Sequence, residues 1–241
     1  MPELRPYQRA VVDTAPSRFL YADPPGTGKT ATALRWASAH GSQHALVAAP
    51  KAVLHHSEAE AARWVSTSSP VTGVGTPPVR ARLRSQAYCT PGSILIVNYE
   101  TMRQDIAALC ECRFDTVIFD EAHRLKGRET QVHKAALKLA RRAPRLALVT
   151  GTPILNRADE MWSALHLLDP KRWPSYWRWV EEHFRISATT FGGRISRPAR
   201  LIQGPLPGAL DRIREEAAEF LFQRPLEELL PDLPEVTETH I

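Results

Sequence analysis

The stretch Phe19-Leu-Tyr-Ala-Asp23-Pro-Pro-Gly-Thr-Gly-Lys-Thr30 decides the fold, because an apolar strand, a loop of small residues and the start of a helix follow one another in it. In such a loop the backbone N–H groups point at phosphate oxygens, and the positive end of the helix adds to their field. The lysine would reach the β- and γ-phosphates of a nucleotide, and the threonine after it would ligate Mg²⁺. The sequence therefore predicts a phosphate-binding loop (P-loop) with the nucleotide-binding residues Gly26, Thr27, Gly28, Lys29 and Thr30. Asp23 stands where the general pattern GxxxxGK[ST] has its first glycine.

Short apolar runs and helical patterns alternate along the chain on both sides of this loop. Strands are predicted at Phe19–Ala22, Ala45–Ala48, Ile94–Val97, Val117–Phe119 and Leu146–Val149. Helices are predicted at Thr30–Ala39, His55–Trp64, Thr130–Arg141 and Ala158–Leu168. Near-continuous apolar strands that alternate with helices indicate an α/β domain with a mostly parallel sheet and helices on both faces. In such sheets ligands bind beyond the carboxyl ends of the strands, which is where the P-loop lies.

Two carboxylates follow another predicted strand, in Thr116-Val-Ile-Phe-Asp120-Glu121-Ala-His123. A P-loop alone binds nucleotide, whereas hydrolysis also needs a metal holder and a group that activates water. Asp120, at the strand end, would hold Mg²⁺ together with Thr30. Glu121 would orient and deprotonate the attacking water, so Lys29, Asp120 and Glu121 are the candidate catalytic residues. We expect His123 to couple this site to the rest of the protein.

A third strand end carries Thr150-Gly151-Thr152. Two hydroxyls and a flexible glycine near the expected γ-phosphate suit a sensor of nucleotide state. We therefore assign coupling roles to Thr150 and Thr152 as well. The alternative is an ordinary turn at the exit of a strand.

The character of the chain changes after Asp169-Pro170. Trp173, Trp177 and Trp179 gather there, a stretch punctuated by glycine and proline covers residues 192–208, and helices are predicted at Ala209–Phe222 and within Pro225–Pro234. No further alternation of strands is expected, so we divide the chain into a domain of residues 1–170 and a helical appendage of residues 171–241. The tryptophans would either stack on nucleic-acid bases or form the core of the appendage, and the spacing of four between the first two favours the core.

Composition excludes several classes of protein. Of the 241 residues 43% are hydrophobic and 24% are charged, and apolar runs recur, so a disordered chain is excluded. No run approaches the roughly 18–20 apolar residues of a membrane span, and the first residues lack a secretory pattern. We therefore expect a cytoplasmic protein, or a nuclear one in a eukaryote. Cys89, Cys110 and Cys112 have neither a closed disulfide set nor zinc spacing. The net charge of +5 is compatible with a polyanionic partner.

Together these motifs resemble the first lobe of superfamily 2 helicase-like ATPases, and more narrowly the Snf2 family. The resemblance runs nearly from end to end in the family's order, through Leu4-Arg-Pro-Tyr-Gln8, the P-loop, Ala48-Ala-Pro-Lys51 with Glu60 and Trp64, Val97-Asn-Tyr-Glu-Thr101, Asp120-Glu-Ala-His-Arg-Leu-Lys126, Leu148-Val-Thr-Gly-Thr-Pro-Ile154 and Pro231-Asp-Leu-Pro234. It implies a RecA-like P-loop NTPase lobe that uses ATP and Mg²⁺, with Gln8 recognising the adenine edge.

The resemblance also implies partners. Lys51 and Thr101, with Arg103 beside them, would contact the backbone of double-stranded DNA. Snf2 enzymes have a second RecA-like lobe that carries arginine fingers, so residues 171–241 would lead towards that lobe, and this chain would hydrolyse ATP slowly without it. We expect a monomeric motor lobe of a double-stranded DNA translocase or remodeller. Two alternatives stay open: a strand-separating helicase or a restriction or defence motor, and a non-catalytic, nucleotide-regulated module that binds nucleic acid.

Overall fold

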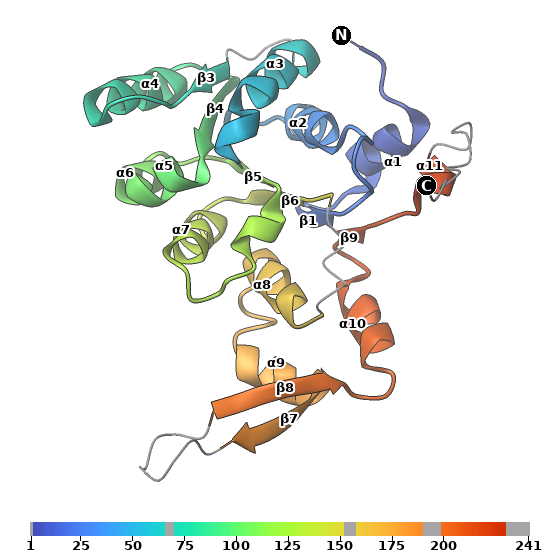
Figure 1. The fold of residues 1–241 in the computed structure, drawn as a ribbon. Helices are drawn as coiled ribbons and strands as arrows, with labels where there is room; N and C mark the ends of the chain where they lie inside the picture. The colour runs from blue at the N-terminus through green and yellow to red at the C-terminus, as the bar shows by residue number, and fades with distance from the viewer. Residues whose placement is uncertain (1, 66–69, 152–157, 190–198, 230–241) are drawn as a thin grey trace, which may run out of the picture.

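The computed structural model describes residues 2–65, 70–151, 158–189 and 199–229 of the chain. Within these ranges a seven-stranded sheet forms the centre of the protein (Figure 1), with the strand order β3-β4-β2-β5-β6-β1-β9. Every pair of neighbours in it is parallel. The strands are β1 (Arg18–Tyr21), β2 (His44–Ala49), β3 (Pro70–Thr72), β4 (Ser93–Asn98), β5 (Thr116–Asp120), β6 (Arg145–Val149) and β9 (Leu221–Phe222). The predicted fold class is confirmed.

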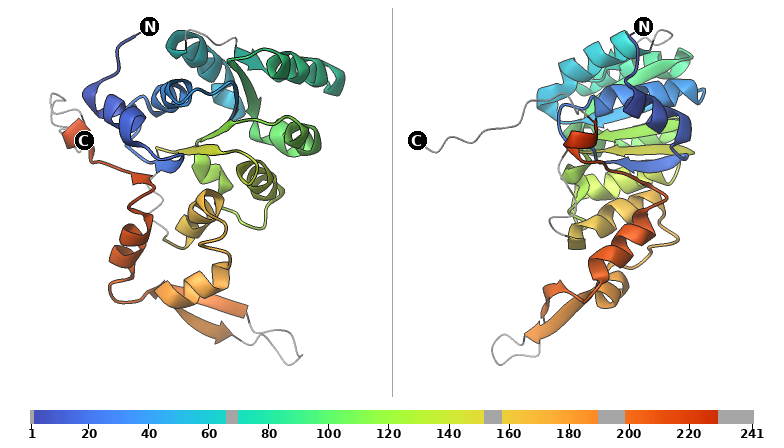
Figure 2. Two further views of the ribbon diagram at one scale, coloured as in Figure 1. Left: turned by 180° about the vertical axis from the view of Figure 1, so that it is seen from behind. Right: turned by 90° about the vertical axis from the view of Figure 1, so that its right-hand side faces the viewer.

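Helices cover both faces of the sheet, as Figures 1 and 2 show. One face carries α1 (Pro6–Thr14), α2 (Lys29–Ala39) and α3 (Leu54–Trp64). The other face carries α4 (Pro77–Cys89), α5 (Tyr99–Gln104), α6 (Ile106–Glu111), α7 (Gln131–Ala140) and α8 (Ala158–Leu168). Two short 3₁₀ helices, η1 (Lys51–Val53) and η2 (Ala122–Leu125), follow β2 and β5. The four helices and five strands predicted before Asp169 are confirmed, each to within one residue at either end.

Side chains alternate across the strands and so form two separate apolar cores. In β1, Phe19 and Tyr21 belong to the core beneath α1, α2 and α3, whereas Leu20 belongs to the core on the opposite face. The Phe19 ring meets the edge of Trp36 of α2, with ring centroids 4.8 Å apart. Because both faces of the central strands are buried, every residue in them can be apolar, and this is why the sequence reveals them as continuous apolar runs.

Arg18 fastens two helices to the amino-terminal edge of the sheet. Its guanidinium donates hydrogen bonds of 2.6–2.9 Å to the carbonyls of Ala140 and Ala143 at the end of α7, and of Leu167 and Leu168 at the end of α8. Carbonyls in the last turn of a helix have no partner within the helix, and a cation there also meets the negative end of the helix dipole. Strand β1 therefore anchors α7 and α8 at one end and begins the P-loop at the other.

The C-terminal part contains strands as well as helices, which corrects the expectation of a helical appendage without strands. Helix α9 (Tyr176–His183) leads into an antiparallel hairpin of β7 (Phe184–Thr189) and β8 (Ala199–Pro205), which lies beyond α8 and away from the main sheet (Figure 1). Helix α10 (Ala209–Ala217) ends five residues before the predicted end at Phe222, and β9 then pairs with β1. Helix α11 (Leu226–Leu229) follows. Strand β9 has only two residues and pairs with β1 near the other end of the chain, so no local periodicity indicates it.

Trp173 and Trp179 are core residues, as expected, whereas Trp177 is only partly buried and does not share a helix with Trp173, because α9 begins at Tyr176. Trp173 is 5% exposed and Trp179 is 3% exposed. Their indole Nε1–H groups both donate to Glu216 of α10, over 3.4 and 3.3 Å, and Nε2 of the buried His183 lies 3.0 Å from the same carboxylate. One carboxylate thus ties α9, α10 and the segment before α9 together.

Within the described ranges no helix combines the length and the apolar character that crossing a membrane requires. Cys89, Cys110 and Cys112 are all free thiols.

Candidate active site

The P-loop connects β1 to α2 and bends at two glycines. Gly26 has a φ of 80° and Gly28 a φ of 73°, a conformation that other residues adopt at a cost. A Cβ at Gly28 would also lie 2.5 Å from Nε2 of Gln8 in α1. Gly28 precedes the first residue of α2, so the backbone N–H groups of the first turn remain available to a ligand. Both predicted glycines are thus required by the geometry of the loop.

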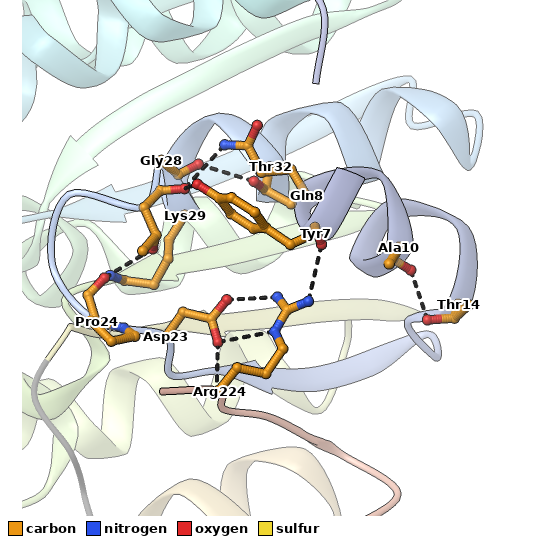
Figure 3. Close-up of polar contacts among 11 residues, drawn as sticks. Tyr7, Gln8, Ala10, Thr14, Asp23, Pro24, Gly28, Lys29, Thr32 and Arg224 are labelled. Carbon is orange, nitrogen blue, oxygen red and sulfur yellow. Dashed lines mark hydrogen bonds and ion pairs between the residues drawn. The ribbon is translucent and has the colours of Figure 1, made fainter. Parts of the chain in front are cut away.

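Lys29 points into the loop that it follows. The side chain is buried, and its Nζ donates to the carbonyl of Pro24 over 2.7 Å (Figure 3). Burial lowers the pKa of Lys29, while the nearby carboxylates of Glu121, Asp23 and Asp120 oppose that shift. The ammonium group is therefore held inside the loop by a carbonyl that a phosphate oxygen can replace as its acceptor.

Asp120 and Thr30 meet, although 90 residues separate them in the sequence. The Thr30 hydroxyl donates to Oδ2 of Asp120 over 2.9 Å, and the backbone N–H of Glu121 donates to Oδ1 over 3.1 Å. Burial raises the pKa of Asp120, and the neighbouring Glu121 adds to that shift. A carboxylate and a hydroxyl are the hard oxygen donors that Mg²⁺ prefers, and a divalent cation would offset the cost of a buried charge. The pair therefore fits the magnesium site that the sequence predicts.

Glu121 has an unusual backbone. Its φ of 54° makes it the one non-glycine residue with positive φ in the part of the chain that the structure describes. It immediately precedes η2, and its carboxylate lies 3.2 Å from Nδ1 of His123. The same nitrogen lies 3.4 Å from the hydroxyl of Thr150, which follows β6. Glu121, His123 and Thr150 thus form a chain of contacts across the ends of β5 and β6.

A cavity of about 410 Å³ unites these groups. Its walls come from the P-loop and α2, from η1 and α3, and from the ends of β5 and β6. The lining residues are Pro25, Gly26, Gly28, Lys29, Thr30, Ala31, Val53, His56, Glu60, Asp120, Glu121 and Gly151. His56 and Glu60 are lining residues that sequence reasoning did not assign to this site. They are four residues apart in α3 and so share one face of that helix. This spacing is the feature of the sequence that could have predicted that both side chains face the same site.

Gln8 lies against the P-loop. Its Nε2 donates to the carbonyl of Thr27 over 3.1 Å, and its Oε1 accepts from the backbone N–H of Arg5 over 2.9 Å. The hydroxyl of Tyr7 donates to the same Thr27 carbonyl over 3.0 Å. The start of α1 is thereby joined to the P-loop by two side chains.

The three predicted nucleic-acid residues lie at one edge of the sheet. Lys51 is exposed and follows β2, and the other two lie in α5 after the neighbouring strand β4. Thr101 is largely buried, and its backbone N–H donates to Oδ1 of Asn98 over 2.8 Å. Arg103 forms an ion pair with Glu100 in the same helix. Lys51 therefore presents its charge to solvent, whereas the charge of Arg103 is already engaged.

Tyr99 connects this edge to the carboxylate site, a contact that the sequence did not predict. It begins α5, and its buried hydroxyl donates to the backbone carbonyl of Asp120 over 2.7 Å. Burial raises the pKa of Tyr99, so the hydroxyl keeps its proton as a donor. The helix that carries Thr101 and Arg103 is thus in direct contact with the end of β5.

Arg224 is a second partner of the P-loop that sequence reasoning missed. It follows β9, and its guanidinium forms an ion pair with Asp23, with Nη2 and Oδ2 2.6 Å apart (Figure 3). No local pattern links these residues, because they are 201 positions apart.

Thr152, the other predicted sensor residue, and the motif Pro231–Pro234 lie outside the described residues.

Comparison with known proteins places this geometry in a family. The model of the SNF2-related domain matches residues 14–239. The chain is 31% identical over 98% of its length to the Arabidopsis thaliana protein named probable ATP-dependent DNA helicase CHR23, of which it covers 23%. It is 27% identical, also over 98% of its length, to helicase ssl-1 of Caenorhabditis elegans, of which it covers 10%. A solved structure of the Sulfolobus solfataricus SWI2/SNF2 ATPase core in complex with dsDNA matches 97% of the chain with a TM-score of 0.74 and 22% identity, and the chain covers 47% of it. The chain thus spans less than half of each of these proteins, and it belongs to the SNF2-related domain family.

Proposed function

We propose that this chain is the ATP-binding motor lobe of a Snf2-type translocase that acts on double-stranded DNA. The observation that carries the proposal is the convergence of Lys29, Thr30, Asp120 and Glu121 on one cavity at the carboxyl ends of parallel strands. A phosphate-binding loop, a metal-binding pair and a carboxylate able to act as a base are the parts that nucleotide hydrolysis requires. ATP-dependent relatives and an ATPase core with the same fold support ATP as the nucleotide.

Each residue has a separate task in this mechanism. Lys29 would exchange its bond to the Pro24 carbonyl for a bond to the phosphate tail, and the P-loop amides would bind the remaining phosphate oxygens. Thr30 and Asp120 would hold Mg²⁺, which when bound neutralises charge on the phosphates. Glu121 would accept a proton from the attacking water. His123 and Thr150 would pass a change at Glu121 to the end of β6.

The complete reaction cycle requires more than this chain in our proposal. We assign residues 1–170 to the ATP-binding lobe and residues 171–241 to an appendage and exit segment that lead towards a second RecA-like lobe. Closure of two lobes around the nucleotide, followed by opening after hydrolysis, would move the protein along DNA. An arginine finger from a second lobe typically contributes about 10³–10⁵ in rate, so we expect this chain alone to turn over ATP slowly.

The first experiment asks whether the P-loop holds nucleotide. A ligand at about 100 times its Kd stabilises a protein by about 2.7 kcal/mol, which raises the melting temperature of a chain of this size by roughly 5–10 °C. We expect ATP with Mg²⁺ to raise the melting temperature of the chain and of Lys134→Ala, which removes an exposed lysine from α7. Lys29→Ala should lose that rise, because the P-loop loses its point charge. An equal rise in Lys29→Ala would show that nucleotide is not held by this loop.

A further inference from the structure

We propose that Arg224 is a positioning residue for nucleotide binding: it holds both ends of the P-loop, so that the segment after β9 sets the affinity for nucleotide. The inference rests on the proposed function, because it assumes that the P-loop binds ATP. It adds a residue outside the cavity, and a segment near the C-terminal end of the described chain, to the groups that control the site.

The first support is the burial of Asp23, the residue that begins the P-loop. Its side chain is 0% exposed, and Arg224 donates three hydrogen bonds to its carboxylate. The backbone N–H and Nε donate to Oδ1 over 2.9 and 3.4 Å, and Nη2 donates to Oδ2 over 2.6 Å. A buried carboxylate that loses its ion-pair partner is strongly destabilised, so Arg224 stabilises Asp23 in this place.

The second support is a separate route from Arg224 to the far side of the loop. The remaining nitrogen, Nη1, donates to the backbone carbonyl of Tyr7 over 3.2 Å, and the guanidinium lies 5.7 Å from the centre of the Tyr7 ring. Tyr7 and Gln8 in turn both bind the carbonyl of Thr27. Figure 3 shows that one guanidinium contacts both Asp23, at the start of the loop, and Tyr7 of α1. The side chains of Tyr7 and Gln8 then continue the second route to Thr27, near the end of the loop.

The third support is where Arg224 comes from. Its segment docks on the strand that leads into the P-loop, because β9 pairs with β1 and the backbone N–H of Ala22 donates to the carbonyl of Phe222 over 2.8 Å. Movement of this segment would withdraw the guanidinium and leave Asp23 unpaired beside Lys29. By thermodynamic reciprocity, a nucleotide that requires an ordered P-loop must in turn hold the segment in place.

This arrangement also explains the departure at Asp23 from the general P-loop pattern. Among the described residues the positive φ angles of the loop occur at Gly26 and Gly28, and Asp23 is not one of them. The backbone at this position therefore does not need glycine, and the position is free to carry a side chain that binds Arg224.

The test measures ATP affinity and stability for Arg224→Ala, Arg224→Lys and Asp23→Asn in the 241-residue chain. The matched control is Arg145→Ala, which removes an arginine about as exposed as Arg224 (23% against 20%) and breaks its pair with Asp115 at the opposite edge of the sheet. We expect Arg224→Ala to weaken ATP binding about 3- to 30-fold by calorimetry. Asp23→Asn should weaken it as well, and Arg224→Lys should restore part of the loss because it keeps one charged donor. Arg145→Ala should lower the melting temperature and leave the Kd unchanged.

Two results would overturn the inference: an unchanged Kd in Arg224→Ala, or an equal loss of affinity in Arg145→Ala. If Arg224→Ala does not fold, Arg224→Lys and Asp23→Asn carry the comparison. Hydrogen exchange gives a second readout, since ATP should protect the backbone amides of residues 221–224 in the wild-type chain and less so in Asp23→Asn. Failure of the proposed function looks different, because the wild-type chain would then bind ATP no better than Lys29→Ala.

Discussion

Glu121 keeps a backbone conformation that costs free energy, and its position explains why. A non-glycine residue in the left-handed region is destabilised by roughly 1–2 kcal/mol relative to the common regions. The φ of 54° turns the chain directly after β5, so that Asp120 remains in the strand while the Glu121 carboxylate lies beside His123 and lines the cavity. Strain of this kind persists where surrounding structure enforces it, and it is common at functional sites.

Two substitutions at this residue separate backbone strain from side-chain chemistry. Glu121→Gly and Glu121→Ala both remove the carboxylate, so they lose the same contacts, but only glycine adopts positive φ without strain. We expect Glu121→Gly to be more stable than Glu121→Ala by about 0.5–1 kcal/mol, after the greater unfolded-state entropy of glycine is subtracted. Urea unfolding midpoints measure the difference. If the position were not strained, Glu121→Gly would instead be less stable than Glu121→Ala, by roughly 0.5–1 kcal/mol.

At the scale of elements, the sequence predicts what local patterns determine and misses what distant partners determine. The central strands are near-continuous apolar runs, so β1, β2, β4, β5 and β6 could be placed from sequence alone. Strand β9 has two residues and exists because it lies beside β1, near the other end of the chain. The same distinction holds in the site. Lys29, Thr30 and Asp120 belong to motifs, whereas the contacts of Arg224 and Tyr99 arise only when separate elements pack together.

Helices α7 and α8 contain two buried histidines whose titration should affect stability. Nδ1 of His133 lies 2.7 Å from the carbonyl of Leu125, and Nδ1 of His166 lies 2.7 Å from the carbonyl of Trp173. The rings are stacked, with centroids 6.5 Å apart. Burial lowers the pKa of both side chains. The charges near them differ in effect: Arg128 and Glu129 act in opposite directions on His133, and Arg141 lowers the pKa of His166 further.

The sign of the pH effect follows from these lowered pKa values. The folded state keeps both rings neutral, while the unfolded state takes up protons as the pH falls below about 6.5. Stability is therefore complete above that value and decreases as the pH falls towards the folded pKa. We expect a lower urea midpoint at about pH 5.5 than at about pH 7.5. His133→Gln should reduce the difference, and His55→Gln, at an exposed position in α3, should leave it unchanged. A midpoint independent of pH in the wild-type chain would contradict this account.

At the scale of the whole molecule, the nucleotide site and the predicted DNA-binding residues lie at the same edge of one parallel sheet. Asp120 ends β5, while Lys51 and α5 follow β2 and β4, and these three strands are adjacent. The contact of Tyr99 with Asp120 joins the two regions directly. A shift of α5 on DNA would therefore act on the strand end that holds the proposed metal ligand, without a long intervening path.

The net charge of +5 alone does not distinguish a DNA-binding face from general attraction to a polyanion, but salt dependence does. Each phosphate that a protein neutralises on duplex DNA contributes about −0.9 to the slope of log K against log salt. We expect Lys51→Ala to make this slope shallower by about that amount for duplex DNA. Arg113→Ala removes the same charge from an exposed site before β5, at the opposite edge of the sheet, and should change the slope little. Fluorescence anisotropy measures the slope for each protein variant with duplex DNA, single-stranded DNA and RNA of equal length. Equal effects of the two substitutions on the slope would show that the protein binds DNA through its net charge and not through a contact at Lys51. Tighter binding to single strands than to duplex would favour a strand-separating helicase over a duplex translocase.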